Sequence, residues 1–142
     1  MKGDYIGRVL HIVTFRSFWG KAMDRYEGVD LYDIESQLTE EEVMIRDMVR
    51  DWVSDEVIPN IEKACRDGIF PDKWRVALGE MGVLGAPLEG YGCPGLSYVA
   101  YGLICQELER GDSGLRSFAS VQGSLAMYPI WDFGSEEQKN HY

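Results

Sequence analysis

Apolar side chains recur at three- and four-residue steps between positions 45 and 61, and charged side chains fill the opposite face of this stretch. The apolar set is Ile45, Met48, Val49, Trp52, Val53, Val57 and Ile61. This spacing predicts an amphipathic helix. Thr39 and Glu42 form the S/T-x-x-E capping box that opens such a helix. Pro59 is expected to kink or divide it, because proline lacks the backbone donor and clashes with the preceding turn.

Two more helices are predicted beyond this one. The first runs from Pro71 to a stop at Gly82. The second runs from Ser97 to Arg110, and Ala100 and Gly102 are expected to allow a neighbouring helix to approach closely. The side chains expected to face inward from it are Val99, Ala100, Leu103, Ile104 and Leu108.

Capping signals mark two later helix starts. Asp112 or Ser113 can cap a helix that follows the glycine-containing break at 111–114. Ser135 and Gln138 repeat the capping-box pattern close to the last residue, Tyr142. We therefore expect a helix that begins there and is truncated within its first two turns.

The stretch 83–95, VLGAPLEGYGCPG, holds four glycines and two prolines. Such a density of breakers predicts an ordered loop rather than a helix or strand. It contains neither GxGxxG nor GxxxxGK[ST], so a loop that links helices is favoured over a phosphate-binding loop.

Composition restricts the class of protein. A length of 142 residues with 45% hydrophobic content suits one folded domain. The formal charge of -10 disfavours nucleic acid and anionic membrane surfaces as partners. No stretch approaches the roughly 20 apolar residues that a membrane span needs.

The cysteines and histidines favour neither a disulfide framework nor a zinc site. Cys65, Cys93 and Cys105 are odd in number and lack CxxC spacing, and only His11 and His141 could complete a metal cluster. Cys105 is interpreted as a small buried hydrophobe rather than a nucleophile. These features are typical of a reducing compartment, and we expect the cytoplasm, with the mitochondrial matrix as the alternative.

Residues 1–22 form a basic leader that differs from the rest of the chain. Four basic residues against Asp4 give this segment a charge of about +3, interleaved with apolar side chains. It is either a presequence or the result of a start placed too early, with Met23 as the true start, and we favour the second. Residues 23–37 are expected to be an extended lead-in to the helical domain at 38–142.

Arg116 and Ser120 are four residues apart, so they share one face of the helix that begins at 112–113. A guanidinium, a hydroxyl and a helix N-terminus together suit a carboxylate ligand. The spacing alone favours a simpler interpretation, a surface ion pair between Arg116 and Glu107 or Glu109.

Two stretches resemble a known family: LTEEEVMIRDMVRD, and the long run from MGVLGAPLEGYGCPG through ELERGDSGLRSFASVQGSL to the end of the chain. From about Leu38 to Tyr142 the sequence is similar to the N-terminal domain of acyl-CoA dehydrogenases, and within that family to the glutaryl-CoA dehydrogenase branch. The resemblance implies an all-α domain that lies before a middle β-domain and a C-terminal helical bundle. The similarity of the run around Arg116 to this family also favours a ligand-binding role for Arg116 over a surface ion pair.

In such an enzyme, the resemblance implies, Arg116 and Ser120 hold the distal carboxylate of the glutaryl chain, and Glu109 is the acid beside that arginine. Glutaryl-CoA would be oxidised and decarboxylated to crotonyl-CoA, with FAD as cofactor and electron-transfer flavoprotein as acceptor. The catalytic base would lie beyond residue 142, and the complete enzyme would be a homotetramer. The fragment alone is therefore expected to be inactive without the missing dehydrogenase domains or a partner chain.

Three positions depart from the pattern of many relatives: Gly111 replaces Val, Leu115 replaces Tyr and Gly123 replaces Ser. Leu115 could alter the polarity beside Arg116, which leaves another dicarboxylyl-CoA or a short branched acyl-CoA as alternative substrates. The alternative to a dehydrogenase domain is a stand-alone, non-catalytic helical module that binds acyl-CoA or a partner chain.

Overall fold

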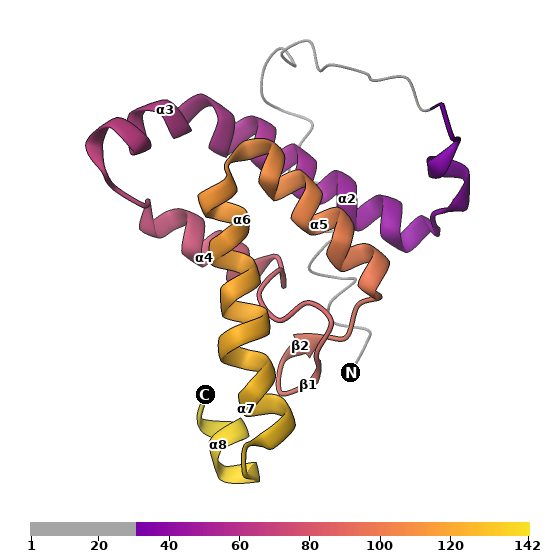
Figure 1. Cartoon of the computed structure of the whole chain (residues 1–142), viewed down its shortest axis with the longest axis vertical. Coiled ribbons are helices and arrows are strands. Elements are labelled where there is room, and N and C mark those ends of the chain that lie inside the picture. The colour runs from indigo at the N-terminus through magenta and orange to yellow at the C-terminus, as the bar shows by residue number, and fades with distance from the viewer. Residues whose placement is uncertain (1–30) are drawn as a thin grey trace.

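The computed structural model describes residues 31–142, and its helices lie in two groups (Figure 1). A long helical run crosses the upper part of the molecule beside α5, and a second run descends from the end of α5 toward the C-terminus. The elements are η2 (Ile34–Gln37), α2 (Glu40–Trp52), η3 (Val53–Val57), α3 (Ile58–Asp67), α4 (Asp72–Glu80), α5 (Tyr98–Gly111), α6 (Ser113–Val121), η4 (Gln122–Met127), α7 (Tyr128–Phe133) and α8 (Glu136–His141). The predicted all-α class is confirmed.

The first predicted helix begins as expected. Thr39 accepts a hydrogen bond from the Glu42 backbone N–H, and the Glu42 carboxylate accepts one from the Thr39 N–H at 3.0 Å, so the capping box is confirmed. The same Glu42 carboxylate also accepts a 2.7 Å bond from Ser97 Oγ. Because Ser97 is the N-cap of α5, one carboxylate joins the starts of two helices.

Pro59 divides this helix without ending it. The residues before it form a π-helical turn, η3, in which the Ile58 N–H bonds to the Val53 carbonyl five residues back. Proline has no backbone N–H, so the regular helical hydrogen bond is absent at Pro59, and the wider π turn lets the helix continue through this position. The same arrangement recurs at η4, where the Tyr128 N–H bonds to the Gly123 carbonyl just before Pro129.

The glycine-rich loop contains a small element that the sequence did not predict. Two-residue strands, β1 (Glu89–Gly90) and β2 (Cys93–Pro94), pair antiparallel with Glu89 opposite Pro94 and Gly90 opposite Cys93. Tyr91 and Gly92 make the turn with positive φ values of 49° and 87°. Glycine tolerates this conformation best, which explains the Gly92 position in the hairpin.

Two later helix starts follow their predicted caps: Asp112 accepts from the Leu115 N–H and Ser135 from the Gln138 N–H. Ser97, predicted as the first residue of its helix, is its N-cap and accepts from the Ala100 N–H. Helix α4 ends near Gly82, where the Val83 N–H bonds to the Leu78 carbonyl at 3.1 Å, as in a Schellman motif. Pro71 lies just before this helix as its N-cap.

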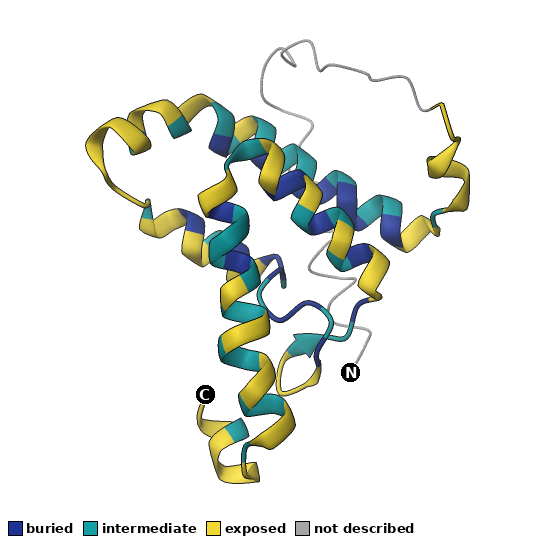
Figure 2. Ribbon diagram, viewed as in Figure 1, coloured by how far each residue is buried: buried dark blue, intermediate teal, exposed yellow. Residues whose placement is uncertain are grey.

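The core lies where α2 and η3 pack against α5 and where α5 packs against α6 (Figure 2). Its fully buried side chains include Val49, Val53, Val57, Leu78, Leu108 and Leu115. Two predictions for α5 were wrong: Val99 is 52% exposed, and Gly102 is exposed with open space around it. The buried stripe of α5 is instead Ala100, Ile104, Glu107 and Leu108.

Gly111 permits close packing of α5 against η3. A Cβ added there would lie 2.8 Å from Val53 Cγ1 and 3.2 Å from Val57 Cγ1. We expect Gly111→Ala to destabilise the protein by about 1–2 kcal/mol, because overpacking outweighs the helix propensity of alanine. Urea unfolding measures this. In a Val53→Ala background the same change should be neutral or stabilising, and an equal loss in both backgrounds would contradict the close contact.

The basic leader and most of the expected lead-in lie outside the described residues. Within residues 31–37, the end of the lead-in forms η2, a single 3-10 turn with no buried residue. Within residues 31–142, no helix is long and apolar enough to span a bilayer.

Candidate functional site

The corner between α5 and α6 places Arg116 in the first turn of α6. Asp112 closes α5 and caps α6 with a 2.8 Å bond from the Leu115 N–H to its carboxylate. Leu115 itself is 0% exposed and belongs to the core. It therefore fills the interior rather than setting the polarity around Arg116, contrary to the expectation from sequence.

Arg116 is held on two sides. Its Nε donates to Glu109 Oε2 at 2.7 Å, and its Nη1 donates to Ser120 Oγ at 3.3 Å. Ser113 Oγ also donates to the Glu109 carboxylate. The structure thus brings together all three residues that the sequence pointed to: Arg116, Ser120 and Glu109.

Both members of the Arg116–Glu109 pair favour their charged forms. Hydrogen bonds from Arg116 and then Ser113 hold the pKa of Glu109 below its ordinary value, and the bond to Glu109 raises the pKa of Arg116. The Arg116 side chain is 37% exposed. A ligand can therefore reach a guanidinium whose orientation is already fixed from one side.

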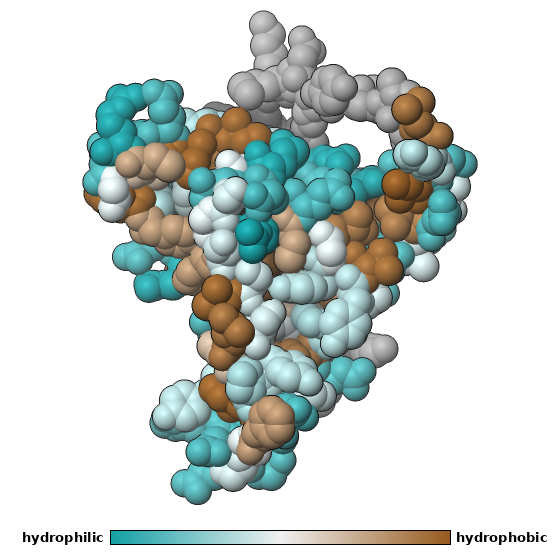
Figure 3. Space-filling view, in the orientation of Figure 1, coloured by the Kyte–Doolittle hydropathy of each residue, from teal (hydrophilic) through white to brown (hydrophobic). Residues whose placement is uncertain are grey.

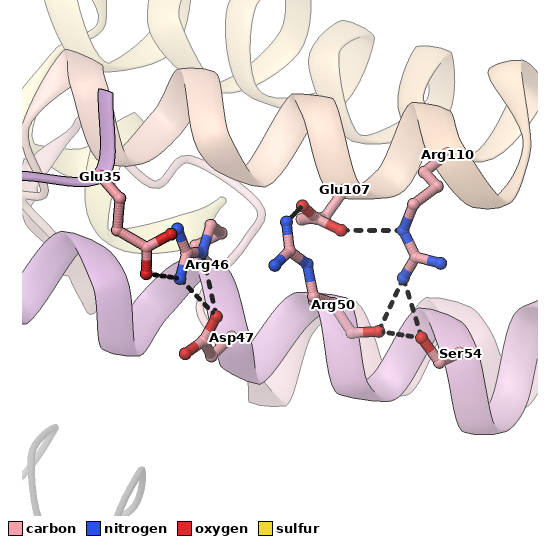
Figure 4. A network of polar contacts seen from close by, with 7 residues as sticks. All are labelled: Glu35, Arg46, Asp47, Arg50, Ser54, Glu107 and Arg110. Atoms are coloured by element: carbon pink, nitrogen blue, oxygen red, sulfur yellow. Dashed lines mark hydrogen bonds and ion pairs between the residues drawn. The ribbon is translucent and has the colours of Figure 1, made fainter. Parts of the chain in front are cut away.

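Glu107 does not take part in this cluster, although sequence spacing offered it as a partner of Arg116. It is 1% exposed and faces α2, from which Arg50 Nη2 donates to it at 2.7 Å. Arg110, on the same helix as Glu107, donates to it from Nε at 2.9 Å (Figure 4). Arg110 also reaches the Arg50 carbonyl and Ser54 Oγ, each at 2.9 Å. Glu107 is thus a packing residue, and of these two acids Glu109 pairs with Arg116.

Sequence reasoning did not consider Tyr101 and Ser124, which lie on the helical segments that carry Glu109 and Ser120. Tyr101, Cys105 and Glu109 follow one another at four-residue steps on α5, so they share one face. Cys105 is half-buried, not fully buried, and burial raises the pKa of its thiol. Ser120 and Ser124 continue the spacing of Arg116 along α6 and η4. This repeated four-residue spacing was the signal available in the sequence.

Other candidate sites in the described part of the chain are weak. No group of three or more His, Cys, Asp or Glu side chains within residues 31–142 is placed to hold a metal ion. A shallow hollow of about 280 Å³ lies between α7 and α8, away from Arg116. Its lining is Pro129, Ile130, Phe133, Gly134, Gln138 and Tyr142.

Comparison with known proteins gives this corner a family context. The model of the acyl-CoA dehydrogenase N-terminal domain matches residues 39–142. The chain belongs to the acyl-CoA dehydrogenase family. Its helical fold is that of the N-terminal domain of these dehydrogenases.

Solved structures of two glutaryl-CoA dehydrogenases from Mycobacterium smegmatis resemble the chain. One is 54% identical with a TM-score of 0.76 and covers 80% of this chain and 30% of its own. The other, a complex with FADH2, is 46% identical with a TM-score of 0.78 and covers 83% of this chain and 31% of its own.

Curated acyl-CoA dehydrogenases are more distant. A probable acyl-CoA dehydrogenase of Bacillus subtilis is 38% identical over 72% of this chain and 27% of its own length. The mitochondrial short-chain specific enzyme of Rattus norvegicus is 32% identical over 99% of this chain and 32% of its own length. The chain thus spans between a quarter and a third of the length of these relatives.

Proposed function

We propose that this chain is the N-terminal portion of a flavin-dependent acyl-CoA dehydrogenase that oxidises and decarboxylates glutaryl-CoA to crotonyl-CoA. In this proposal Arg116 and Ser120 hold the distal carboxylate of the substrate, and Glu109 orients the arginine. The observation that carries it is the Arg116 guanidinium, fixed by Glu109 and Ser120 and still accessible at the α5–α6 corner.

The charge of this site supports a diacid rather than a simple fatty acyl chain. A carboxylate that leaves water needs a paired cation and hydrogen-bond donors, and arginine offers a planar fork for it. A hydrocarbon tail would gain nothing from a guanidinium and would favour an apolar lining. The glutaryl-CoA dehydrogenases among the similar structures point to the same class of substrate.

The Arg116 site does not fit the flavin. Its acid, Glu109, stays charged beside Arg116 and would repel the diphosphate of FAD. The flavin and the catalytic base would then be held by parts of the complete enzyme other than the described residues, with electron-transfer flavoprotein as acceptor and a homotetramer as the assembly.

Exposed apolar side chains support packing against such further domains. Val121, Leu125 and Phe133 on α6, η4 and α7 are 50%, 70% and 82% exposed, and apolar surface is visible along this lower part of the molecule (Figure 3). Exposed apolar surface of this kind is typical of a contact face. The free cysteines among residues 31–142 suit the cytoplasm, with the mitochondrial matrix as the alternative.

Turnover by the complete enzyme tests the proposal. With an artificial electron acceptor, glutaryl-CoA should give crotonyl-CoA and carbon dioxide, with a kcat/KM well above that for butyryl-CoA. Product analysis by mass spectrometry and carbon dioxide release measure this. Preference for butyryl-CoA, or oxidation without carbon dioxide, would reject the glutaryl assignment.

A further inference from the structure

The Glu109 carboxylate spans the corner between α5 and α6 and uses its two oxygens on two different partners. Oε2 accepts from Arg116 Nε at 2.7 Å, and Oε1 accepts from Ser113 Oγ. Ser113 and Arg116 are three residues apart at the start of α6, so both side chains can reach the same acid on α5. The acid is therefore fixed through both of its oxygens, one by the arginine and one by the serine.

The Ser113 hydroxyl is not needed to cap α6. A serine at a helix start commonly serves as the N-cap, where its oxygen satisfies an unpaired backbone donor. In this helix Asp112 is the N-cap, and its carboxylate accepts from the Leu115 N–H at 2.8 Å. The Ser113 hydroxyl instead donates across the corner to Glu109. Its contact with the acid thus needs an explanation other than helix capping.

The bond from Ser113 determines how Glu109 pairs with Arg116. A carboxylate with both oxygens free tends to pair with arginine in a bidentate fork, which occupies two guanidinium nitrogens. Because Ser113 holds Oε1, Glu109 bonds to Arg116 Nε through Oε2. Within residues 31–142, Arg116 Nη1 then donates to Ser120 at 3.3 Å, and Arg116 Nη2 donates no hydrogen bond. The terminal nitrogens therefore stay available to a ligand carboxylate.

The Arg116–Glu109 pair would be a weak anchor by itself. The two side chains are 37% and 47% exposed, so solvent screens their attraction, and holding two long side chains in one geometry costs conformational entropy. The bond from Ser113 restricts Glu109 without adding a charge. Hydrogen bonds from Arg116 and then from Ser113 lower the pKa of Glu109, which keeps it a carboxylate that only accepts at neutral pH.

We infer that Ser113 is a positioning residue for substrate binding, which acts through Glu109 to keep the terminal nitrogens of Arg116 turned toward the distal carboxylate of the acyl chain. This inference rests on the proposed function and leaves the roles of Arg116, Ser120 and Glu109 in it unchanged. Ser113 should matter for a diacid substrate and not for a monoacyl chain, because a monoacyl chain has no carboxylate to place against Arg116.

The Ser113→Ala variant of the complete enzyme tests the inference, because it removes the hydroxyl and leaves the Asp112 cap in place. We expect KM for glutaryl-CoA to rise about three- to tenfold, since a hydrogen bond to a charged group is lost. The kcat for glutaryl-CoA and the kcat/KM for butyryl-CoA should stay within about twofold. Ser113→Thr keeps a hydroxyl and should restore KM. Ser36→Ala is the control, because it removes an exposed hydroxyl that bonds to the Asp33 carbonyl, and it should alter neither substrate.

A second set of variants tests whether Ser113 acts through Glu109. In a Glu109→Ala background, Ser113→Ala should raise KM for glutaryl-CoA by less than about 1.5-fold, because the acid that Ser113 positions is gone. Steady-state kinetics of the two single variants and the double variant measure this coupling. The same rise in KM in both backgrounds would indicate a direct contact between Ser113 and the ligand and would overturn the inference.

The two proposals fail in different ways. If the wild-type enzyme has no preference for glutaryl-CoA, the proposed function fails and the role of Ser113 fails with it. If the wild type prefers glutaryl-CoA and Ser113→Ala leaves its KM unchanged, only the role of Ser113 is overturned. Equal losses on glutaryl-CoA and butyryl-CoA, or no recovery of KM in Ser113→Thr, would likewise overturn it, because they would indicate a structural effect.

Discussion

Replacement of Arg116 by alanine in the complete enzyme is expected to lower kcat/KM for glutaryl-CoA by about 100-fold or more. The variant loses the cation that offsets desolvation of the ligand carboxylate and leaves Glu109 without its 2.7 Å partner. Two carboxylates would then approach each other with no cation between them. Steady-state kinetics on glutaryl-CoA and butyryl-CoA measure the effect, and butyryl-CoA turnover should fall less than about threefold.

Two further variants sharpen this test. Arg116→Lys keeps the charge but loses the planar fork, so its loss should be intermediate. Arg66→Ala removes an exposed arginine on α3 that pairs with Glu62, and it should leave both substrates unaffected. Equal losses on glutaryl-CoA and butyryl-CoA in Arg116→Ala would contradict the carboxylate-binding role.

Removal of both arginines around Glu107 is expected to produce the largest loss of stability. The double change Arg50→Met and Arg110→Met strands a carboxylate that is 1% exposed, at a cost of roughly 3–5 kcal/mol. Adding Glu107→Leu should recover most of this loss, because an uncharged core side chain needs no partner. Urea unfolding at neutral pH measures all three proteins.

The contribution of Glu107 to the free energy of unfolding should depend on pH in opposite directions in the wild type and in the double variant. In the wild type, burial raises the pKa of Glu107, but hydrogen bonds from Arg50 and Arg110 bring it below the ordinary value. The wild type therefore loses this stabilisation as pH falls through the lowered pKa. Without the arginines, burial alone raises the pKa of Glu107. The contribution of Glu107 to stability is then greatest in acid and falls as pH rises through the raised pKa.

A matched pair of surface changes controls for the loss of two positive charges. Arg66 and Arg75 form exposed ion pairs with Glu62 and Asp72, so Arg66→Met with Arg75→Met should cost no more than about 1 kcal/mol. If the Arg66→Met, Arg75→Met variant and the Arg50→Met, Arg110→Met variant lost similar free energies of unfolding, burial of Glu107 would have no special effect.

Helix starts and the Arg116–Ser120 face could be predicted because their signals are local. A capping box needs only residues three apart, and a shared helical face needs only residues four apart. Thr39, Ser97, Asp112 and Ser135 accordingly cap helices in the structure. The link from this face to a substrate came from resemblance, and the roles of Arg116, Ser120 and Glu109 stay predictions.

Contacts between distant segments could not be predicted in this way. Glu107 and Glu109 look alike in the sequence, and the difference between them depends on α2, from which Arg50, 57 residues earlier, bonds to Glu107. Val99 looked like a core residue because it is apolar, yet Glu107 occupies part of the buried stripe instead. The hairpin escaped prediction because each of its strands has only two residues.

The Glu42 carboxylate, shared by the first turns of α2 and α5, has a consequence for local opening of the fold. Helix ends normally fray independently, and their amide protons exchange with solvent through separate small fluctuations. Here Thr39 N–H and Ser97 Oγ depend on the same side chain, and Ala100 N–H depends in turn on Ser97. We therefore expect hydrogen exchange at these two helix ends, which lie more than 50 residues apart in the sequence, to be coupled through the Glu42 carboxylate.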